Sequence, residues 1–227
     1  MASRVFVSAN SEHLVHTGSA GVPVIMPAVC TVMFWMNNDN AASESIWFTN
    51  NNNTVIGGGH GYMAENFNND LIYNVSGTSG ANATTTGAAT TSATWDHACG
   101  VTRSDTDRSA FVNGGSEGTS STSRAPNESL YTKIVLGSNP PNSIYSDGKL
   151  SHVATWSVAL SDDEIASLAA GAHPRQVRPD ALVEYYPLNR LSGNEPGTIA
   201  GFDLTDTNTV TYTDDTPPMI GHHILAP

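Results

Sequence analysis

The stretch that decides the fold reads WDHACGV at residues 95–101 and continues, after a short turn, as RSAFVNG at residues 108–114. In an extended chain every second residue points to the same face, and both runs fit this period of two. The second run ends on Asn113 and Gly114, the strongest short signal for a hairpin turn. This part of the chain is therefore predicted to form two antiparallel strands.

The same alternation recurs along the chain, with turn residues between the runs. The further predicted strands lie at residues 4–7, 30–36, 71–75, 130–136, 149–156 and 182–188. Many short strands of this kind indicate an all-β, two-sheet antiparallel sandwich. Residues 76–94 are low in complexity; we expect a loop leading into a strand from about Ala88, although a flat strand of small side chains is the alternative.

One helix is predicted near residues 161–170. Ser161 is placed to cap it, and Glu164 three residues later completes a capping box. Leu160 and Ile165 have the spacing of a hydrophobic staple, and Gly171 is a C-terminal stop signal. These signals predict one short surface helix that places apolar side chains on a sheet.

Composition limits the classes of function. Charged residues make up 13% of the chain, about half the usual share, and the formal net charge is −12. Such a charge repels phosphate backbones, so nucleic acid is not an expected partner. Cys30 and Cys99 have no metal-site spacing and are predicted to be buried free thiols.

No signal peptide is visible at the N-terminus, so the protein is expected to be made in a host cytoplasm. The longest apolar stretch, around residues 22–36, is broken by Pro23 and Pro27, which argues against a membrane partner. We expect one domain over residues 1–227.

Three segments resemble the concanavalin A-like (laminin-G-like) family. Residues 95–114 are similar to the family's hairpin pattern W-H-x-A-x-V followed by R-x-Y-V-D/N-G. Residues 147–156 lead into Leu160–Ile165 as the family's G-x-I-D-x-V strand leads into A-L-S-x-x-E-I, and residues 32–36 are similar to its F-T-I-S-A-W-V strand. The resemblance implies a jelly-roll sandwich.

The tail carries a narrower resemblance. Residues 173–188, followed by Gly201–Thr205 and Asp214–Pro218, resemble a C-terminal extension that is common in phage and prophage members of the family. The resemblance implies that residues 173–227 form an extension whose last strand returns to close the sandwich.

Catalysis is not expected. Enzymes of this family hydrolyse glycans with closely spaced carboxylates on one strand, in an E-x-D-x-x-E run, and the chain has none. Glu184 is a lone strand acid that we expect on a solvent face. No Gly-x-Ser-x-Gly nucleophile motif is present either.

The sequence offers four candidates for a binding site without determining one. Aromatic side chains stack on sugars, and Trp35 and Trp47 are the candidates for this contact. Members of the family often carry calcium, and Asp105 and Asp107 in the hairpin loop offer oxygen ligands of the kind Ca²⁺ prefers. Asp-rich turns are equally expected without a metal, and no other cofactor is implied.

These observations lead to two functional hypotheses. The first is a bacteriophage structural protein on the virion exterior, a capsid decoration or cement protein bound to the major capsid protein lattice or to other virion proteins. Such a protein is expected to be a homo-oligomer, a trimer or a dimer, because symmetric assembly on a lattice adds avidity. The alternative is a glycan-binding, lectin-like adhesin, either the receptor-binding module of a phage tail or an accessory domain of a carbohydrate-active enzyme.

Overall fold

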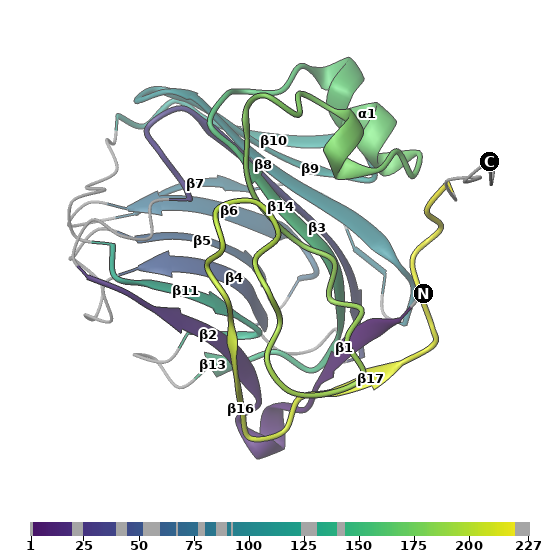
Figure 1. Cartoon of the computed structure of the whole chain (residues 1–227). Coiled ribbons are helices and arrows are strands. Elements are labelled where there is room, and N and C mark those ends of the chain that lie inside the picture. Colours follow the sequence, from purple (N-terminus) through teal and green to yellow (C-terminus); the bar gives the residue numbers. More distant parts are fainter. Residues whose placement is uncertain are drawn as a thin grey trace.

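The fold is that of a computed structural model, which describes residues 2–19, 25–39, 45–51, 60–66, 68–76, 80–84, 90–91, 93–123, 131–139 and 144–220. Figure 1 shows two antiparallel sheets packed face to face, with one helix outside the first sheet. The predicted two-sheet jelly-roll sandwich is confirmed. None of the helices in these ranges has the length and apolar character needed to cross a membrane.

The first sheet, sheet A, has eight strands, and the second, sheet B, has seven. Sheet A comprises β10 (Ser116–Ser120), β9 (Asp107–Val112), β8 (Asp96–Ser104), β3 (Cys30–Asn38), β14 (Gly148–Trp156), β1 (Ser3–Phe6) and β17 (Thr211–Thr213) in that order, with β15 (Leu182–Tyr186) also paired to β14. Sheet B comprises, in order, β16 (Thr205–Thr207), β2 (His13–Thr17), β11 (Lys133–Leu136), β4 (Ser45–Asn51), β5 (His60–Glu65), β6 (Leu71–Ser76) and β7 (Gly80–Thr84). A two-stranded ribbon, β12 (Ser138–Asn139) and β13 (Ile144–Tyr145), and the short 3-10 helices η1 (Ser8–Asn10) and η4 (Pro174–Gln176) complete the described elements.

Strand β3 lies between two apolar layers, and all nine of its residues are buried. Cys30, Val32, Phe34 and Met36 face the core between the sheets, as the alternation predicts. The opposite face, including Trp35, packs into a second apolar layer on the outer side of sheet A. Fully burying one such side chain stabilises a fold by about 1.5–3 kcal/mol, so this strand anchors both layers.

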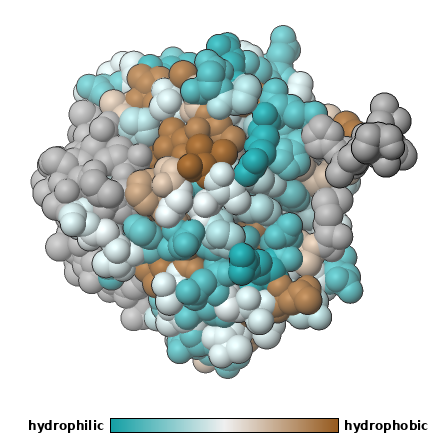
Figure 2. Space-filling model, viewed as in Figure 1, coloured by the Kyte–Doolittle hydropathy of each residue, from teal (hydrophilic) through white to brown (hydrophobic). Residues whose placement is uncertain are grey.

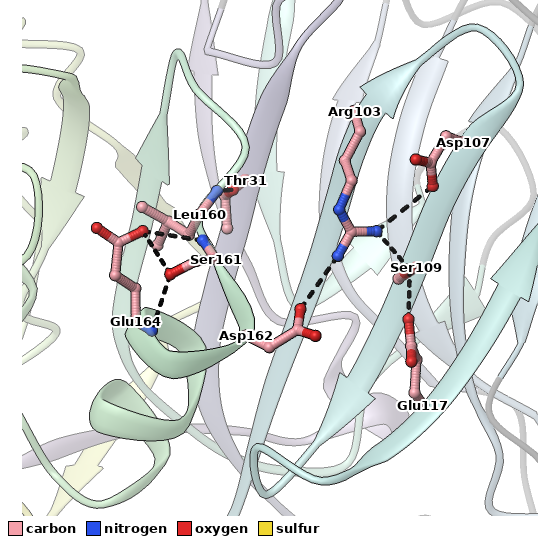
Figure 3. Close-up of polar contacts among 9 residues, drawn as sticks. All are labelled: Thr31, Arg103, Asp107, Ser109, Glu117, Leu160, Ser161, Asp162 and Glu164. Atoms are coloured by element: carbon pink, nitrogen blue, oxygen red, sulfur yellow. Dashed lines mark hydrogen bonds and ion pairs between the residues drawn. The ribbon is translucent and has the colours of Figure 1, made fainter.

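The predicted helix is confirmed as α1 (Asp162–Ala169), with Ser161 as its N-cap. The capping box forms in both directions: the Glu164 amide donates to the Ser161 hydroxyl, and the Ser161 amide donates to the Glu164 carboxylate (Figure 3). Gly171 adopts a φ of 96°, which ends the helix in a left-handed turn that favours glycine. Ile165 and Leu168 are buried in the second apolar layer.

Buried charged side chains attach the C-terminal region to the sandwich. In Figure 1 this region, drawn in yellow-green, crosses the front of the sandwich between β15 and β16. The Arg4 guanidinium donates to the carbonyl oxygens of Arg190 and Gly193, at 3.1 and 2.6 Å. Glu184 is fully buried, so its expected position on a solvent face was wrong. Its carboxylate accepts hydrogen bonds from the amides of Ile199 and Phe202, a task invisible in the local sequence.

The expected loop over residues 76–94 was partly wrong. Residues 80–84 form β7, which pairs with β6 at the edge of sheet B. Strand β8 begins at Asp96. Ala88, near which the start of a strand was expected, lies outside the described residues. Strands pair through backbone hydrogen bonds, so a segment of small side chains can form a strand. Such a segment has no alternation of apolar residues, which is the signal that identifies other strands in the sequence.

Both cysteines are free and buried, as predicted. Cys30 faces the core between the sheets, where its thiol lies 3.4 Å from the Tyr73 hydroxyl. Cys99 belongs to the second apolar layer, and burial raises the pKa of its thiol. The two thiols therefore lie on opposite faces of sheet A.

His97, which faces the same layer as Cys99, is fully buried with its ring against Trp35 at a centroid distance of 5.3 Å. Neither ring nitrogen has a hydrogen-bond partner in the part of the chain that the structure describes. Burial lowers the pKa of His97 to about 3, because a charged imidazole loses its hydration there.

The helix cap gives a first test. Replacing Ser161 by Ala should lower the free energy of unfolding by about 1 kcal/mol, because one N-terminal amide loses its acceptor. Thermal melts of wild type and variant measure this. Ser167→Ala on the same exposed helix is the matched control and should be neutral, since alanine favours helix. Equal melting temperatures for the Ser161 variant and wild type would contradict the capping box.

His97 gives a second test. Between pH 6.5, the ordinary pKa of histidine, and about pH 3, His97 binds a proton in the unfolded chain but not in the folded chain. The free energy of unfolding therefore falls as the pH falls. We expect His97→Leu to reduce this slope by about 1.4 kcal/mol per pH unit, measured by denaturant unfolding across that window.

The control for this test is Cys99→Ala, which leaves a cavity in the same layer. It should lower stability at every pH without changing the slope, because its thiol stays protonated throughout. If the dependence of stability on pH is the same in the His97 variant and in wild type, then His97 binds its proton equally well in the folded and the unfolded chain, which would contradict its lowered pKa.

Candidate functional site

The outer face of sheet B carries a row of polar side chains. Phe48 and Met63, on β4 and β5, face the core between the sheets, so the adjacent Thr49 and Tyr62 point outward. Cross-strand pairing places Thr49 opposite Tyr62, and Tyr62 opposite Asn74 on β6. Three side chains from three strands thus lie side by side on one surface.

The row extends across the neighbouring strands. On β11, Val135 lies opposite Thr49, and Lys133 lies opposite Asn51. The Asn51 side-chain amide donates to the Thr49 hydroxyl at 3.3 Å. We call the set Thr49, Asn51, Tyr62, Asn74 and Lys133 the polar row.

The polar row is shielded rather than fully open to solvent. The side chains of Thr49, Asn51 and Asn74 are buried, while Tyr62 and Lys133 are half-buried. Hydroxyl and amide groups both donate and accept hydrogen bonds, and a tyrosine ring adds an apolar face. This chemistry suits a ligand that presents many hydroxyl groups and some apolar C–H surface.

A short ribbon flanks the polar row. Strands β12 and β13 leave sheet B directly after β11, and the Ser146 hydroxyl fixes the ribbon by donating to the Ile46 carbonyl at 2.7 Å. The half-buried ring of Tyr145 lies 6.1 Å from that of His13, which points outward on β2. Tyr145 of the ribbon and His13 of β2 thus place two rings at the end of sheet B where β4 begins.

Neither tryptophan predicted as a stacking residue is available for that role. Trp35 is 2% exposed, because β3 is covered on both faces. Trp47 is 0% exposed, in the core between the sheets, where a bulge between Ile46 and Phe48 turns it inward. Both indoles contribute packing instead.

The predicted calcium ligands do not converge on a metal site. The Asp107 carboxylate lies 3.4 Å from the Arg103 guanidinium, which also reaches Asp162 at 3.2 Å (Figure 3). Asp105 is exposed, and its carbonyl oxygen accepts a hydrogen bond from Arg108. Among the residues described, no group of three or more His, Cys, Asp or Glu could hold a metal ion. A guanidinium supplies the positive charge at this hairpin.

Sequence reasoning missed the polar row for a physical reason. The run Ser45–Asn51 does not alternate cleanly, because the bulge places Trp47 and Phe48 both toward the core. Strand β5 does not alternate cleanly either, because one of its positions is Gly61, whose missing side chain makes room for Met26. The Asn and Thr content of these strands was the available signal, but it does not say which residues share a face.

Comparison with known proteins now adds the family. The model of a family described as the concanavalin A-like lectin/glucanases superfamily matches residues 15–166. The chain belongs to this superfamily. The resemblance seen in its hairpin and helix motifs is thereby confirmed. A search of curated protein sequences gives no match.

Solved structures of this concanavalin A-like fold superpose on most of the chain. A Bacteroides ovatus protein proposed to bind carbohydrate has a TM-score of 0.69 at 16% identity, over 96% of this chain and 61% of its own. The Ruminococcus gnavus sialidase module CBM40 has a TM-score of 0.58 at 12% identity, over 74% and 98%. Tailspike protein 2 of the Escherichia coli O157:H7 bacteriophage CAB120 has a TM-score of 0.55 at 12% identity, over 82% and 26%. The chain thus spans about three fifths of the first of these proteins and a quarter of the last.

The hairpin gives a test of the metal hypothesis. Because Arg103 already pairs with Asp107, excess calcium or a chelator should leave the melting temperature unchanged. Asp107→Asn should change stability by less than about 1 kcal/mol, since exposed ion pairs contribute little. A melting temperature that rises with calcium in wild type but not in Asp107→Asn would establish a metal site here.

Proposed function

We propose that this chain is a non-catalytic, lectin-like module that binds glycans on the outer face of sheet B. The observation that carries the proposal is the polar row, in which Tyr62 lies between Thr49 and Asn74 with Asn51 and Lys133 alongside. The proposed site therefore spans four neighbouring strands and is reached at Tyr62 and Lys133, the two members of the row that are not buried.

The chemistry of the polar row supports a sugar ligand. Hydroxyl and amide side chains match the mixed donor and acceptor pattern of sugar hydroxyls. A tyrosine ring can stack on the C–H face of a pyranose, as aromatic side chains do in binding sites that combine apolar and polar contacts. These side chains project from paired strands, which fix their spacing better than a loop would.

The buried carboxylates support a binding role without hydrolysis. Glu65 accepts hydrogen bonds from Asn38 and Thr90, and burial raises its pKa. Asp96 accepts from Asn113 and from the Thr91 amide, and burial raises its pKa as well. Both face the core side of their sheets, so they are not placed as acid and base on the polar row.

Two structural relatives support the same class of ligand. The first is the Bacteroides ovatus protein proposed to bind carbohydrate, and the second is CBM40, which has also been solved with α2,3 sialyllactose. At these identities the likeness shows the fold, and the polar row supplies the argument for binding.

A glycan array with the purified chain tests the proposal. Tyr62→Ala should weaken binding by about tenfold, the loss of roughly one stacking contact. Tyr212→Ala is the matched control, because Tyr212 is 43% exposed on β17, at the edge of the other sheet. Equal binding by the Tyr62 variant and wild type, or no binding to any glycan, would refute the proposed site.

A second candidate is a role on a bacteriophage particle, as an exterior capsid decoration or cement protein. The phage-like motifs of residues 173–218 favour it, and so does the tailspike among the structural relatives. Its partners would be the major capsid protein lattice or other virion proteins, with the chain as a trimer or dimer. A chain with few charged residues and a net negative charge suits such an exterior position.

Quantitative mass spectrometry of purified particles separates the two candidates. A copy number comparable with that of the capsid protein would support decoration. A few copies per particle, together with sugar-competed binding, would assign the chain to an adhesin.

A further inference from the structure

A cluster of ionisable side chains lies on sheet A, away from the polar row. His152 on β14, Tyr185 on β15 and His173 before η4 meet at the Tyr185 hydroxyl. His152 Nδ1 lies 2.6 Å from this oxygen, and His173 Nε2 lies 3.3 Å from it. The His173 and Tyr185 rings meet nearly at right angles with centroids 5.3 Å apart, and the Arg175 guanidinium covers the Tyr185 ring at 5.6 Å.

The backbone is strained where it presents His152. This residue has a φ of 51°, in the left-handed region, at a bulge where two residues of β14 oppose one of β3. Such a conformation costs a residue other than glycine about 1–3 kcal/mol, and bulges commonly redirect a side chain. The bulge aims the imidazole at Tyr185, so the hydrogen bond holds a strained backbone in place.

The proton arrangement of the cluster follows from the hydrogen bonds of His173. Its Nδ1 accepts from the Arg175 amide, which leaves the proton on Nε2. The Tyr185 hydroxyl therefore donates its proton to Nδ1 of His152, which is 6% exposed and neutral at ordinary pH. His173 Nε2–H can then donate to the same hydroxyl oxygen. A proton added to His152 Nδ1 turns this acceptor into a donor, and the Tyr185 proton loses its partner.

The surroundings offer little compensation for a charge on His152. The Arg175 guanidinium contributes positive charge beside the Tyr185 ring, and His173 repels a charge on His152 when it is itself protonated. The Glu184 carboxylate is turned to the amides of the 199–202 segment, and Glu195 lies in the field of Arg4. None of the acids described faces the His152 ring directly.

We propose that His152, Tyr185 and His173 form an acid-sensitive latch, which fastens β15 and residues 173–198 to β14 and opens when His152 takes up a proton. The fastened segment includes Thr198, whose amide and hydroxyl both donate to the Tyr185 carbonyl. Opening relieves the strain at His152 and frees the start of the C-terminal region, and it withdraws Tyr186 and Leu188 from the edge of the core between the sheets.

The ionisation of the cluster agrees with this latch. Burial, and then the charge of His173, lower the pKa of His152 to about 4, whereas a released imidazole returns to about 6.5. The folded pKa is thus depressed, so the closed state is fully favoured above about 6.5 and is lost as the pH falls toward about 4. Burial lowers the pKa of His97 to about 3, so global stability also falls over this range, and the opening of the latch must exceed that global change.

Hydrogen exchange followed by mass spectrometry tests the latch on the full chain. After correction for intrinsic rates, the opening constant of residues 173–198 should rise about tenfold per pH unit between about 6.5 and 4. Peptides from β3 and β8 should lose protection only as far as the free energy of global unfolding falls, and they should stay better protected than residues 173–198 at every pH. Uniform loss of protection across the sandwich would overturn the proposal, since it would report global acid unfolding.

Two variants make the test specific. His152→Asn keeps a residue that tolerates the left-handed conformation but cannot titrate, so exchange of residues 173–198 should no longer depend on pH. Tyr185→Phe should open the segment already at neutral pH. Tyr186→Phe is the matched control, because its hydroxyl donates to the Phe202 carbonyl on the core side, and it should keep the wild-type pH response. A wild-type pH response in His152→Asn would refute the latch.

Discussion

The structure depends on the burial of β3 on both faces. One face closes the core between the sheets, and the other accepts the layer formed by α1 and the segments around β15. Because apolar layers cover β3 on both sides, its side chains contribute packing. This constraint explains why Trp35 lies in the outer apolar layer and is not available for stacking on a ligand.

Close packing also fixes where the two sheets touch. Gly100 on β8 faces the Tyr73 ring, and a side chain there would lie 2.5 Å from a ring atom. The Tyr73 hydroxyl then reaches Thr102 at 2.8 Å and Cys30 at 3.4 Å. The buried Tyr73 hydroxyl has hydrogen-bond partners only because the packing of the two sheets places Thr102 and Cys30 of sheet A next to it.

Buried charged side chains hold the C-terminal region to the sandwich. Arg4, Glu184 and Glu195 each bind backbone groups of the C-terminal region, which contributes strands to both sheets. Removing one partner would leave a buried charge uncompensated, so the region is tied to the sandwich by electrostatics as well as by pairing. The latch at His152 lies at the beginning of this region, where the attachment depends on neutral hydrogen bonds.

The sequence by itself determined the features that depend on near neighbours. Alternation identified eight of the seventeen described strands, Asn113 and Gly114 marked the hairpin, and Ser161 with Glu164 marked the helix, because each signal spans only a few residues. Only the tertiary structure decided which polar residues are buried and which share a face. Sheet order brings β11, β4, β5 and β6 together, and a bulge in β4 changes the face to which its following side chains point. The polar row therefore follows from the long-range register of the strands, which no local sequence pattern encodes.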